Sequence, residues 1–187
     1  RPLLTLATAK LCQYSGYRHL SLASTIEFIH TATLLHDDVV DGSKKRRGKK
    51  TANFIWGNKP SILVGDFLLS KAFKILINDG SLKCIDIISS VSEKISFGEV
   101  KQLMSVGNSN ISESDYLEII GYKTAELFSA ACQLSAEISE INETKKKSLK
   151  DFGYFLGISY QIIDDTLDYF SEEKISGKEI GNDFKEN

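Results

Sequence analysis

The chain is poor in the residues that interrupt helices. It has two prolines in 187 residues, and long stretches repeat an apolar residue every three or four positions, as amphipathic helices do. No apolar run approaches the roughly 20 residues that span a bilayer, so no transmembrane segment is predicted. The length favours one domain. We therefore expect an all-α helical bundle.

Cysteine is scarce and the charge is nearly balanced, which excludes several classes of protein. Cys12, Cys84 and Cys132 are odd in number, widely spaced and set in apolar surroundings. This pattern favours free core thiols in a reducing, cytoplasmic compartment over a disulfide frame or a zinc site. The net charge of -2 is typical neither of a general nucleic-acid binder nor of a protein held on a membrane by charge.

The hydrophobic pattern places the breaks between helices. Pro60 suits the first turn of a helix, with Asn58 or Lys59 near its cap. Residues 42–59 and the tail from 172 have no helical periodicity and are predicted to be irregular. The helices are predicted over residues 2–14, 20–41, 60–78, 81–105, 112–140 and 144–171.

The first acidic cluster follows an apolar helix. Asp37, Asp38 and Asp41 form the pattern D-D-x-x-D. Residues four apart lie on one face of a helix, so Asp37 and Asp41 point together and Asp38 lies to one side. Such carboxylates suit Mg²⁺, which keeps several waters and shares phosphate oxygens. A solvated acidic helix end is the alternative, although the helix dipole disfavours acids there.

The second acidic cluster repeats the pattern 127 residues later. Asp164, Asp165 and Asp168 lie in "YQIIDDTLDYF", which is otherwise largely apolar. If the two helices face each other, six carboxylates converge at one cavity mouth, and such a concentration of charge needs divalent metal. One D-D-x-x-D is weak evidence of a site, but two copies that each end an apolar helix are much stronger.

A basic run begins three residues after the first acidic cluster. A solvated loop, a localisation signal or a nucleic-acid patch would each account for it, but the neighbouring aspartates would repel a phosphate backbone. A compact diphosphate, held by metal on one side and by guanidinium groups on the other, fits both charges. The run comprises Lys44, Lys45, Arg46, Arg47, Lys49 and Lys50.

Other polar residues lie within apolar helices. His30 precedes Asp37 by seven residues and shares its helix face, although a lone histidine is more often a core residue. Lys123 and Thr124 open a helix rich in small residues, where a lysine can also extend to solvent. Gln161 lies one turn before Asp164. Small side chains in the same region indicate either close helix packing or space for a long apolar ligand: Ala125, Ser129, Cys132 and Ala136.

Together these stretches resemble the trans-polyprenyl diphosphate synthase family, in particular its long-chain, octaprenyl-type members. The resemblance covers nearly the whole chain. It implies an isoprenoid synthase-type all-α bundle around a deep central cavity, usually in a homodimer, with Mg²⁺ as cofactor. The matching stretches are "LLHDDVVDGSKKRRGKKTAN", "GNKPSILVGDFLLSKAF", "GEVKQL", "YKTAELFSAAC" and "YQIIDDTLDY".

The resemblance also implies a role for each motif residue. Asp37 and Asp41 match Mg²⁺ ligands, with Asp38 beside them, and Asp164 matches the ligand of the second motif, which Asp165 and Asp168 complete. Arg1, His30 and Arg47 match contacts to isopentenyl diphosphate. The positions that match contacts to the allylic diphosphate are Arg46, Lys123, Thr124, Gln161 and Lys178.

The implied reaction is the condensation of isopentenyl diphosphate with an allylic diphosphate. In the family, a bulky aromatic four or five positions before the first motif stops chain growth. Thr33 and Ala32 occupy those positions and are small, so a medium-to-long product, about octaprenyl, is predicted for a quinone side chain. Ile29, Phe28 and Ile26 are candidates for a deeper stop.

The chain departs from the family pattern at its ends and at one internal position. Only Arg1 and Pro2 remain of a Gly-Gly-Lys-Arg-x-Arg-Pro motif, and the chain stops at "DFKEN", before the family's last helices. We therefore interpret residues 1–187 as a single synthase domain truncated at both ends. Gly42 stands where an acid is common.

Several alternatives remain open from the sequence. A shorter-chain farnesyl or geranylgeranyl diphosphate synthase would share both motifs. A terpene cyclase also ionises a prenyl diphosphate, but gives Arg1, His30 and Arg47 no task. A non-catalytic partner subunit tends to lose an aspartate motif, and both are intact here. A purely structural bundle leaves the clustered aspartates unexplained.

Overall fold

The structure is a computed structural model that describes residues 1–107 and 110–170, without the side chains of residues 168–170. Short helices and a hairpin connect long helices. The elements are α1 (Pro2–Leu11), α2 (Arg18–Val40), β1 (Lys45–Arg46), β2 (Lys49–Lys50), α3 (Ala52–Trp56), α4 (Asn58–Asp79), α5 (Leu82–Ser105), α6 (Glu113–Ile120), the π-helix η1 (Gly121–Ala125), α7 (Glu126–Ile138) and α8 (Glu143–Phe170).

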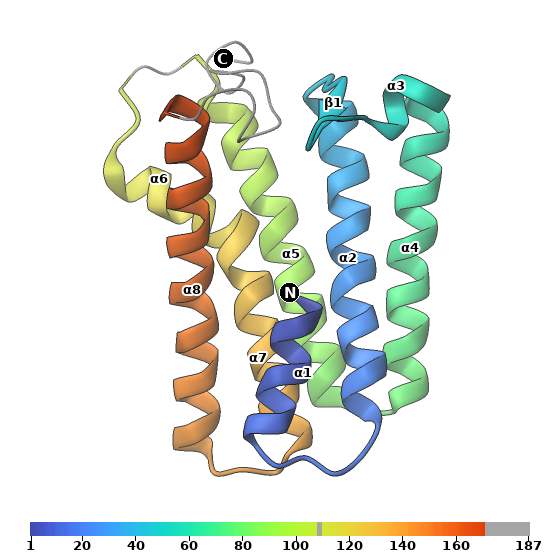
Figure 1. Cartoon of the computed structure of the whole chain (residues 1–187), viewed down its shortest axis with the longest axis vertical. Coiled ribbons are helices and arrows are strands. Elements are labelled where there is room, and N and C mark those ends of the chain that lie inside the picture. The colour runs from blue at the N-terminus through green and yellow to red at the C-terminus, as the bar shows by residue number, and fades with distance from the viewer. Residues whose placement is uncertain (108–109, 171–187) are drawn as a thin grey trace.

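The long helices stand side by side as a bundle, with the hairpin and α3 at one end (Figure 1). α2 and α8 both run toward that end, so the last turns of both helices lie there. α4 packs along α2, and α7 packs along α8. Because these two helices run in the same direction, the bundle brings both aspartate motifs to the same end (Figure 1).

α7 is the central helix. Every residue of α7 except Gln133 and Glu137 is buried, and a helix that is buried all round must be covered on every side by others. It contacts α1, α2, α5 and α8. Leu127, Ala130 and Leu134 of α7 pack in one core with Ile26 and Ile29 of α2 and with residues of α4 and α5.

Small residues allow α7 and α8 to approach closely. A Cβ added at Gly157 would lie 2.5 Å from the Cα of Ala125, and one added at Gly153 would lie 2.6 Å from the carbonyl oxygen of Phe128. On the other side of α7, the Thr8 hydroxyl of α1 lies 3.6 Å from Cys132 Sγ. Of the two interpretations of the small-residue stripe, the structure therefore supports close helix packing.

Helix boundaries follow local signals in most places. Ser81 and Ser112 cap α5 and α6 by accepting hydrogen bonds from the Cys84 and Asp115 backbone amides, as N-cap serines do. Gly80 ends α4 in the left-handed conformation, which glycine adopts without a Cβ penalty.

Two expectations about local structure were wrong. Residues 42–59 contain a hairpin and α3, and the predicted helix over 112–140 is divided into α6, η1 and α7. α4 begins at Asn58 with Gly57 as its N-cap, so Asn58 lies next to the cap and Pro60 lies in the first turn, as predicted. The tail from 172 lies outside the described residues. The three cysteines are free, as predicted; Cys84 and Cys132 are buried, whereas Cys12 is partly buried.

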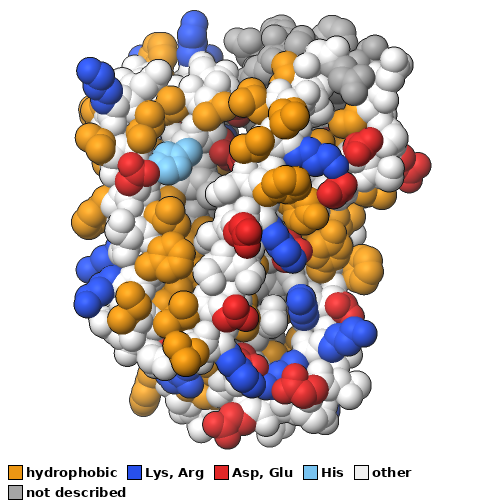
Figure 2. Space-filling model, turned by 180° about the vertical axis from the view of Figure 1, so that it is seen from behind, with side chains coloured by type: hydrophobic (Ala, Val, Ile, Leu, Met, Phe, Trp, Pro, Cys, Tyr) orange, Lys and Arg blue, Asp and Glu red, His pale blue; other side chains and the backbone are white. Residues whose placement is uncertain are grey.

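Charge patterns on the surface are mixed. Figure 2 shows hydrophobic side chains spread among acidic and basic ones on one side of the bundle. In the described part of the chain, none of the helices has the length and apolar character needed to cross a membrane.

Candidate active site

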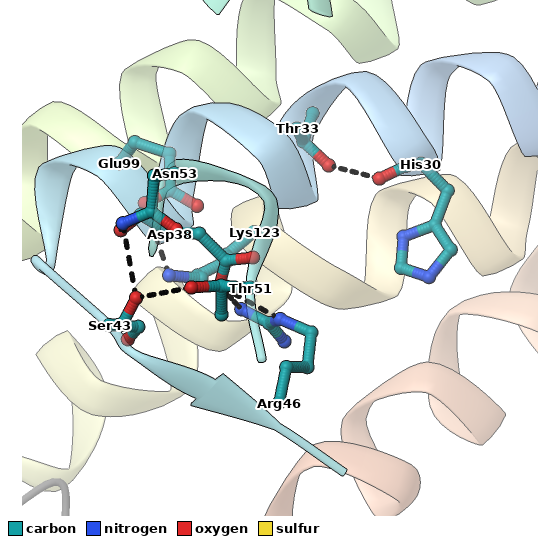
Figure 3. A network of polar contacts seen from close by, with 9 residues as sticks. All are labelled: His30, Thr33, Asp38, Ser43, Arg46, Thr51, Asn53, Glu99 and Lys123. Carbon is teal, nitrogen blue, oxygen red and sulfur yellow. Dashed lines mark hydrogen bonds and ion pairs between the residues drawn. The ribbon is translucent and has the colours of Figure 1, made fainter. Parts of the chain in front are cut away.

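Lys123 lies close to the carboxylates of the first motif and to Glu99 of α5. Its Nζ is 3.1 Å from Glu99 Oε2 (Figure 3). Burial alone would lower the pKa of Lys123, but the charges of Asp37, Glu99 and Asp41 outweigh burial and raise it. The ammonium group is therefore held in its charged form, paired with Glu99 of α5 and close to the acidic end of α2.

Asp37 is a carboxylate whose charged form is disfavoured by burial. Burial raises its pKa to about 7, Lys123 opposes this shift, and the charges of Glu99 and Asp41 add to it. Partial burial also raises the pKa of Asp41, again against Lys123. Asp41 follows α2 as its C-cap and keeps near-helical angles, so the two carboxylates share a side as their spacing predicts. A cation bound between them would offset their charge.

Asp38 has a different environment from its neighbours. It is buried, and Arg46 Nε donates to its Oδ1 at 2.9 Å, with Arg46 Nη2 also at 2.9 Å. Its backbone carbonyl accepts a hydrogen bond from Asn53 Nδ2 at 2.8 Å. Figure 3 shows Arg46 reaching from β1 to the end of α2. This contact fixes the basic hairpin beside the acidic motif.

The hairpin places its second arginine at a tight turn. Lys45 pairs with Lys50, and Arg46 pairs with Lys49, which leaves a two-residue turn. Arg47 has φ 51° and Gly48 has φ 72°, the positive pair that two-residue hairpin turns favour. The Arg47 side chain remains close enough to lower the pKa of both Arg1 and His30.

Arg1 and His30 meet on the side of α2 that faces α1 and α7. Arg1 Nη1 is 2.7 Å from His30 Nε2, and the guanidinium lies 4.7 Å from the centre of the Phe128 ring. Burial, followed by the charge of Arg1, lowers the pKa of His30 to about 3. A neutral imidazole therefore accepts from a guanidinium that also stacks on an aromatic ring.

A chain of hydrogen bonds joins η1 to the second motif. Thr124 donates to Gln161 Oε1 at 2.7 Å, and Gln161 Nε2 donates to Asp165 Oδ1 at 2.7 Å. The Tyr116 hydroxyl donates to Asp165 Oδ2 at 2.6 Å. Lys123 and Thr124 are consecutive, so η1 faces the first motif with one side chain and the second motif with the next. Single π-helical turns are frequent at functional sites.

The whole length of the chain matches one protein family. Residues 1–187 match the family model described as polyprenyl synthetase. The chain belongs to the polyprenyl synthetase family. It is 46% identical over 186 residues to the octaprenyl diphosphate synthase of Escherichia coli, an alignment that covers 100% of this chain and 58% of that protein.

Solved polyprenyl synthetases share the fold. One is the polyprenyl synthase of Caulobacter crescentus complexed with calcium and isoprenyl diphosphate, with TM-score 0.95 and 47% identity over 99% of this chain and 56% of that one. Another is a decaprenyl diphosphate synthase of Rhodobacter capsulatus, with TM-score 0.93 and 48% identity over 99% of this chain and 57% of that one. The chain thus spans a little over half the length of these relatives.

The carboxylates of the first motif have the chemistry that suits a magnesium ion. Among the described residues, no group of three or more His, Cys, Asp and Glu forms a metal cage by itself. Asp37 and Asp41 nevertheless offer hard oxygen ligands at a point where burial leaves negative charge poorly compensated. Mg²⁺ is commonly held by one or two carboxylates while waters and phosphate oxygens complete its octahedron.

The remaining predicted residues have varied places in the polyprenyl synthetase fold. Ala32 is buried and Thr33 is partly buried, with its hydroxyl donating to the His30 carbonyl at 2.9 Å. Asp164 is exposed near the end of α8. The side chain of Asp168 and the whole of Lys178 lie outside the described residues.

Sequence reasoning assigned no role to four partners of these residues. Glu99 was visible as an acid next to Gly98 in the quoted "GEVKQL" stretch, where a Cβ at Gly98 would lie 3.1 Å from the Lys123 amide nitrogen. The partners of the other three could not be read from the sequence, because their contacts bridge 15 to 127 residues. They are Asn53, Tyr116 and Phe128.

Proposed function

We propose that the protein is a trans-prenyltransferase that condenses isopentenyl diphosphate with an allylic diphosphate. The product is a medium-to-long-chain polyprenyl diphosphate, about octaprenyl, that supplies a quinone side chain. One observation carries the proposal: two consecutive residues of η1 link the two motifs. Lys123 lies close to Asp37, and Thr124 is hydrogen-bonded to Gln161 beside the second motif. Membership of the polyprenyl synthetase family supports it.

In this proposal, one end of the bundle binds the allylic diphosphate. Asp37 and Asp41 on one side, and Asp164 with Asp168 on the other, would hold Mg²⁺. Bound Mg²⁺ would act as a Lewis acid that stabilises charge on the departing diphosphate. Lys123, with its raised pKa, supplies a positive charge to the same oxygens. Preorganised charges of this kind favour ionisation of the allylic bond.

A second diphosphate site lies on the other side of α2. Arg1 and His30 are bonded to each other, and the charge of Arg47 is close to both. Arginine forks suit diphosphate oxygens, and the neutral His30 ring adds a ring nitrogen that donates or accepts according to its tautomer. We assign isopentenyl diphosphate to this site, so that its double bond attacks the allylic cation.

We place the reacting carbon atoms beside the apolar core of the bundle. The allylic cation must be kept from water until the new bond forms, and Ile26, Ile29 and Leu127 belong to a buried apolar core. The released diphosphate takes the proton, so no side chain is assigned as the general base. The product is one isoprene unit longer and can react again.

The decisive experiment is a prenyl-transfer assay. The protein is incubated with farnesyl diphosphate, isopentenyl diphosphate and Mg²⁺, and products are sized by chromatography. We expect consumption of isopentenyl diphosphate and products near octaprenyl length. A farnesyl or geranylgeranyl product would identify a shorter-chain synthase. Conversion of farnesyl diphosphate without consumption of isopentenyl diphosphate would indicate a cyclase, and binding without turnover would indicate a partner subunit.

The exposed apolar surface and the free thiols bear on assembly and location. Several large apolar side chains of α4 and α5 are exposed, among them Leu63, Phe67, Val100 and Leu103, and contiguous exposed apolar surface commonly marks an interface. We propose a homodimer, which sedimentation equilibrium would detect. The three free thiols support a cytoplasmic location, where cysteines stay reduced.

A further inference from the structure

Asp165 has both carboxylate oxygens engaged by the protein itself. The Tyr116 hydroxyl donates to Oδ2 at 2.6 Å, and Gln161 Nε2 donates to Oδ1 at 2.7 Å. Gln161 is itself fixed, because its Oε1 accepts from the Thr124 hydroxyl at 2.7 Å. Three elements therefore meet at this carboxylate: α6 through Tyr116, η1 through Thr124 and α8 through Asp165.

This arrangement sets the rotation of α8 at the second motif. Consecutive residues of an α-helix point about 100° apart. Tethering Asp165 to α6 and η1 therefore fixes the direction in which Asp164 projects. Asp165 is partly buried, whereas Asp164 is exposed near the end of α8. The first aspartate of the pair is thereby directed away from the tether.

The first motif uses the same device with a different donor. Asp38, the second aspartate of that pair, is buried and bonded to Arg46, while Asp37 faces Lys123 and carries the raised pKa. In both motifs the second aspartate is thus satisfied by protein donors. Hydrogen-bonding partners of this kind orient the residues that coordinate a metal without coordinating it themselves.

We propose that Tyr116 is a positioning residue of the second aspartate motif, which holds Asp165 so that Asp164 is presented to a metal-bound diphosphate. The proposal rests on the function proposed above. In it, Asp165 positions rather than coordinates, and the Tyr116 hydroxyl acts through it. Tyr116→Phe keeps the ring and removes only the hydroxyl.

The test measures binding of inorganic pyrophosphate by calorimetry at a series of fixed Mg²⁺ concentrations. We expect Tyr116→Phe to need about tenfold more Mg²⁺ than the unmodified protein for half-maximal pyrophosphate binding, in the range found for partners of metal ligands. Residual binding without Mg²⁺ should be unchanged, because the lysines and arginines remain. Tyr17→Phe, at a tyrosine that is 84% exposed, is the matched control and should match the unmodified protein.

Two further variants separate positioning from general weakening. Asp165→Asn should raise the Mg²⁺ requirement in the same direction, and the double variant Tyr116→Phe/Asp165→Asn should be no worse than Asp165→Asn alone. An unchanged Mg²⁺ requirement in Tyr116→Phe overturns the proposal. The proposal is also overturned if Tyr116→Phe loses pyrophosphate binding equally with and without Mg²⁺ and has a lower melting temperature. If the unmodified protein shows no Mg²⁺-dependent pyrophosphate binding, the proposed function itself fails.

Discussion

At the scale of single residues, the site contains two side chains whose charged forms are disfavoured by burial. Asp37 is an acid with its pKa raised to about 7, and His30 is a base with its pKa lowered to about 3; burial is the main cause of both shifts. Shifts of this size mark candidate functional positions. Each shift also makes stability depend on pH in a direction that can be measured.

Asp37→Asn should stabilise the protein at alkaline pH while removing its Mg²⁺-dependent diphosphate binding. The folded-state pKa of Asp37 lies above the ordinary value of 3.8, so stability is lost as pH rises from about 4 to about 7, and the cost is complete above that range. Removing the charge should raise the free energy of unfolding by about 1–2 kcal/mol at pH 8. The gain should vanish near pH 4.

Urea denaturation of both proteins at pH 8 and pH 4 checks this expectation. Asp86→Asn is the matched control, because Asp86 is an exposed aspartate near the start of α5. It should leave both stability and diphosphate binding unchanged. Equal stability of Asp37→Asn and the unmodified protein at pH 8 would show that burial does not disfavour the Asp37 charge.

His30→Gln should make the protein less sensitive to mild acid. The folded-state pKa of His30 is lowered, so the unfolded chain takes up a proton below about pH 6.5 that the folded protein does not. Stability therefore falls as pH decreases from about 6.5 toward 3. Glutamine cannot titrate, so the variant should lose about 1 kcal/mol less between pH 7 and pH 5. Parallel melting temperatures in the two proteins across this range would contradict the expectation.

At the scale of elements, the sequence predicts the long helices well because their apolar periodicity is local information. α5 was predicted over 81–105 and spans 82–105. The hairpin was missed because its strands contain only Lys and Arg and show no apolar alternation. The π-helix was missed because one residue too many in a turn leaves the hydrophobic pattern of "YKTAELFSAAC" nearly unchanged.

The same distinction between local and long-range information applies to the candidate site. Its aspartates could be selected from spacing, since D-D-x-x-D places Asp37 and Asp41 on one helix face, whereas roles for its basic residues came from the family resemblance. Their partners could not, because Tyr116 reaches Asp165 across 49 residues and Lys123 reaches Glu99 across 24. Only the packing of α5, α6 and α8 around η1 creates these pairs.

The position of Ala32 on α2 leads to a prediction about product length. Ala32 lies five residues before Asp37 and is 2% exposed, with Ile29 about one turn deeper. If it borders the path of the growing chain, Ala32→Phe should shorten the main product by several isoprene units, as chromatography would show. Ser24→Phe adds the same ring to an exposed position of α2 and should leave the product unchanged.

The stability of Ala32→Phe separates this interpretation from simple packing. A phenylalanine forced against a packed neighbour costs about 1–3 kcal/mol, whereas one that enters space for a ligand costs little. We expect a small change in the midpoint of urea denaturation together with shorter products. A large loss of stability with unchanged product length would assign Ala32 to helix packing.

At the scale of the whole molecule, two helices that are far apart in sequence contribute to one end of the bundle (Figure 1). Neither motif alone offers a metal cage in the described part of the chain. A ligand that engages both would connect α2 to α8 across the centre of the fold. Binding to the native state alone stabilises a protein by mass action, so such a connection should be visible as stability.

Mg²⁺ and pyrophosphate together should raise the melting temperature more than the sum of their separate effects. At a ligand concentration of about 100 times the dissociation constant the gain is about 2.7 kcal/mol, or roughly 5–10 °C for a chain of this size. Chelation with EDTA should reverse it. Asp37→Asn and Asp164→Asn should each abolish the joint effect although they lie in different helices, while Asp86→Asn should preserve it. If Asp164→Asn keeps the full shift, the ligand is held by the first motif alone and α8 has no part in binding it.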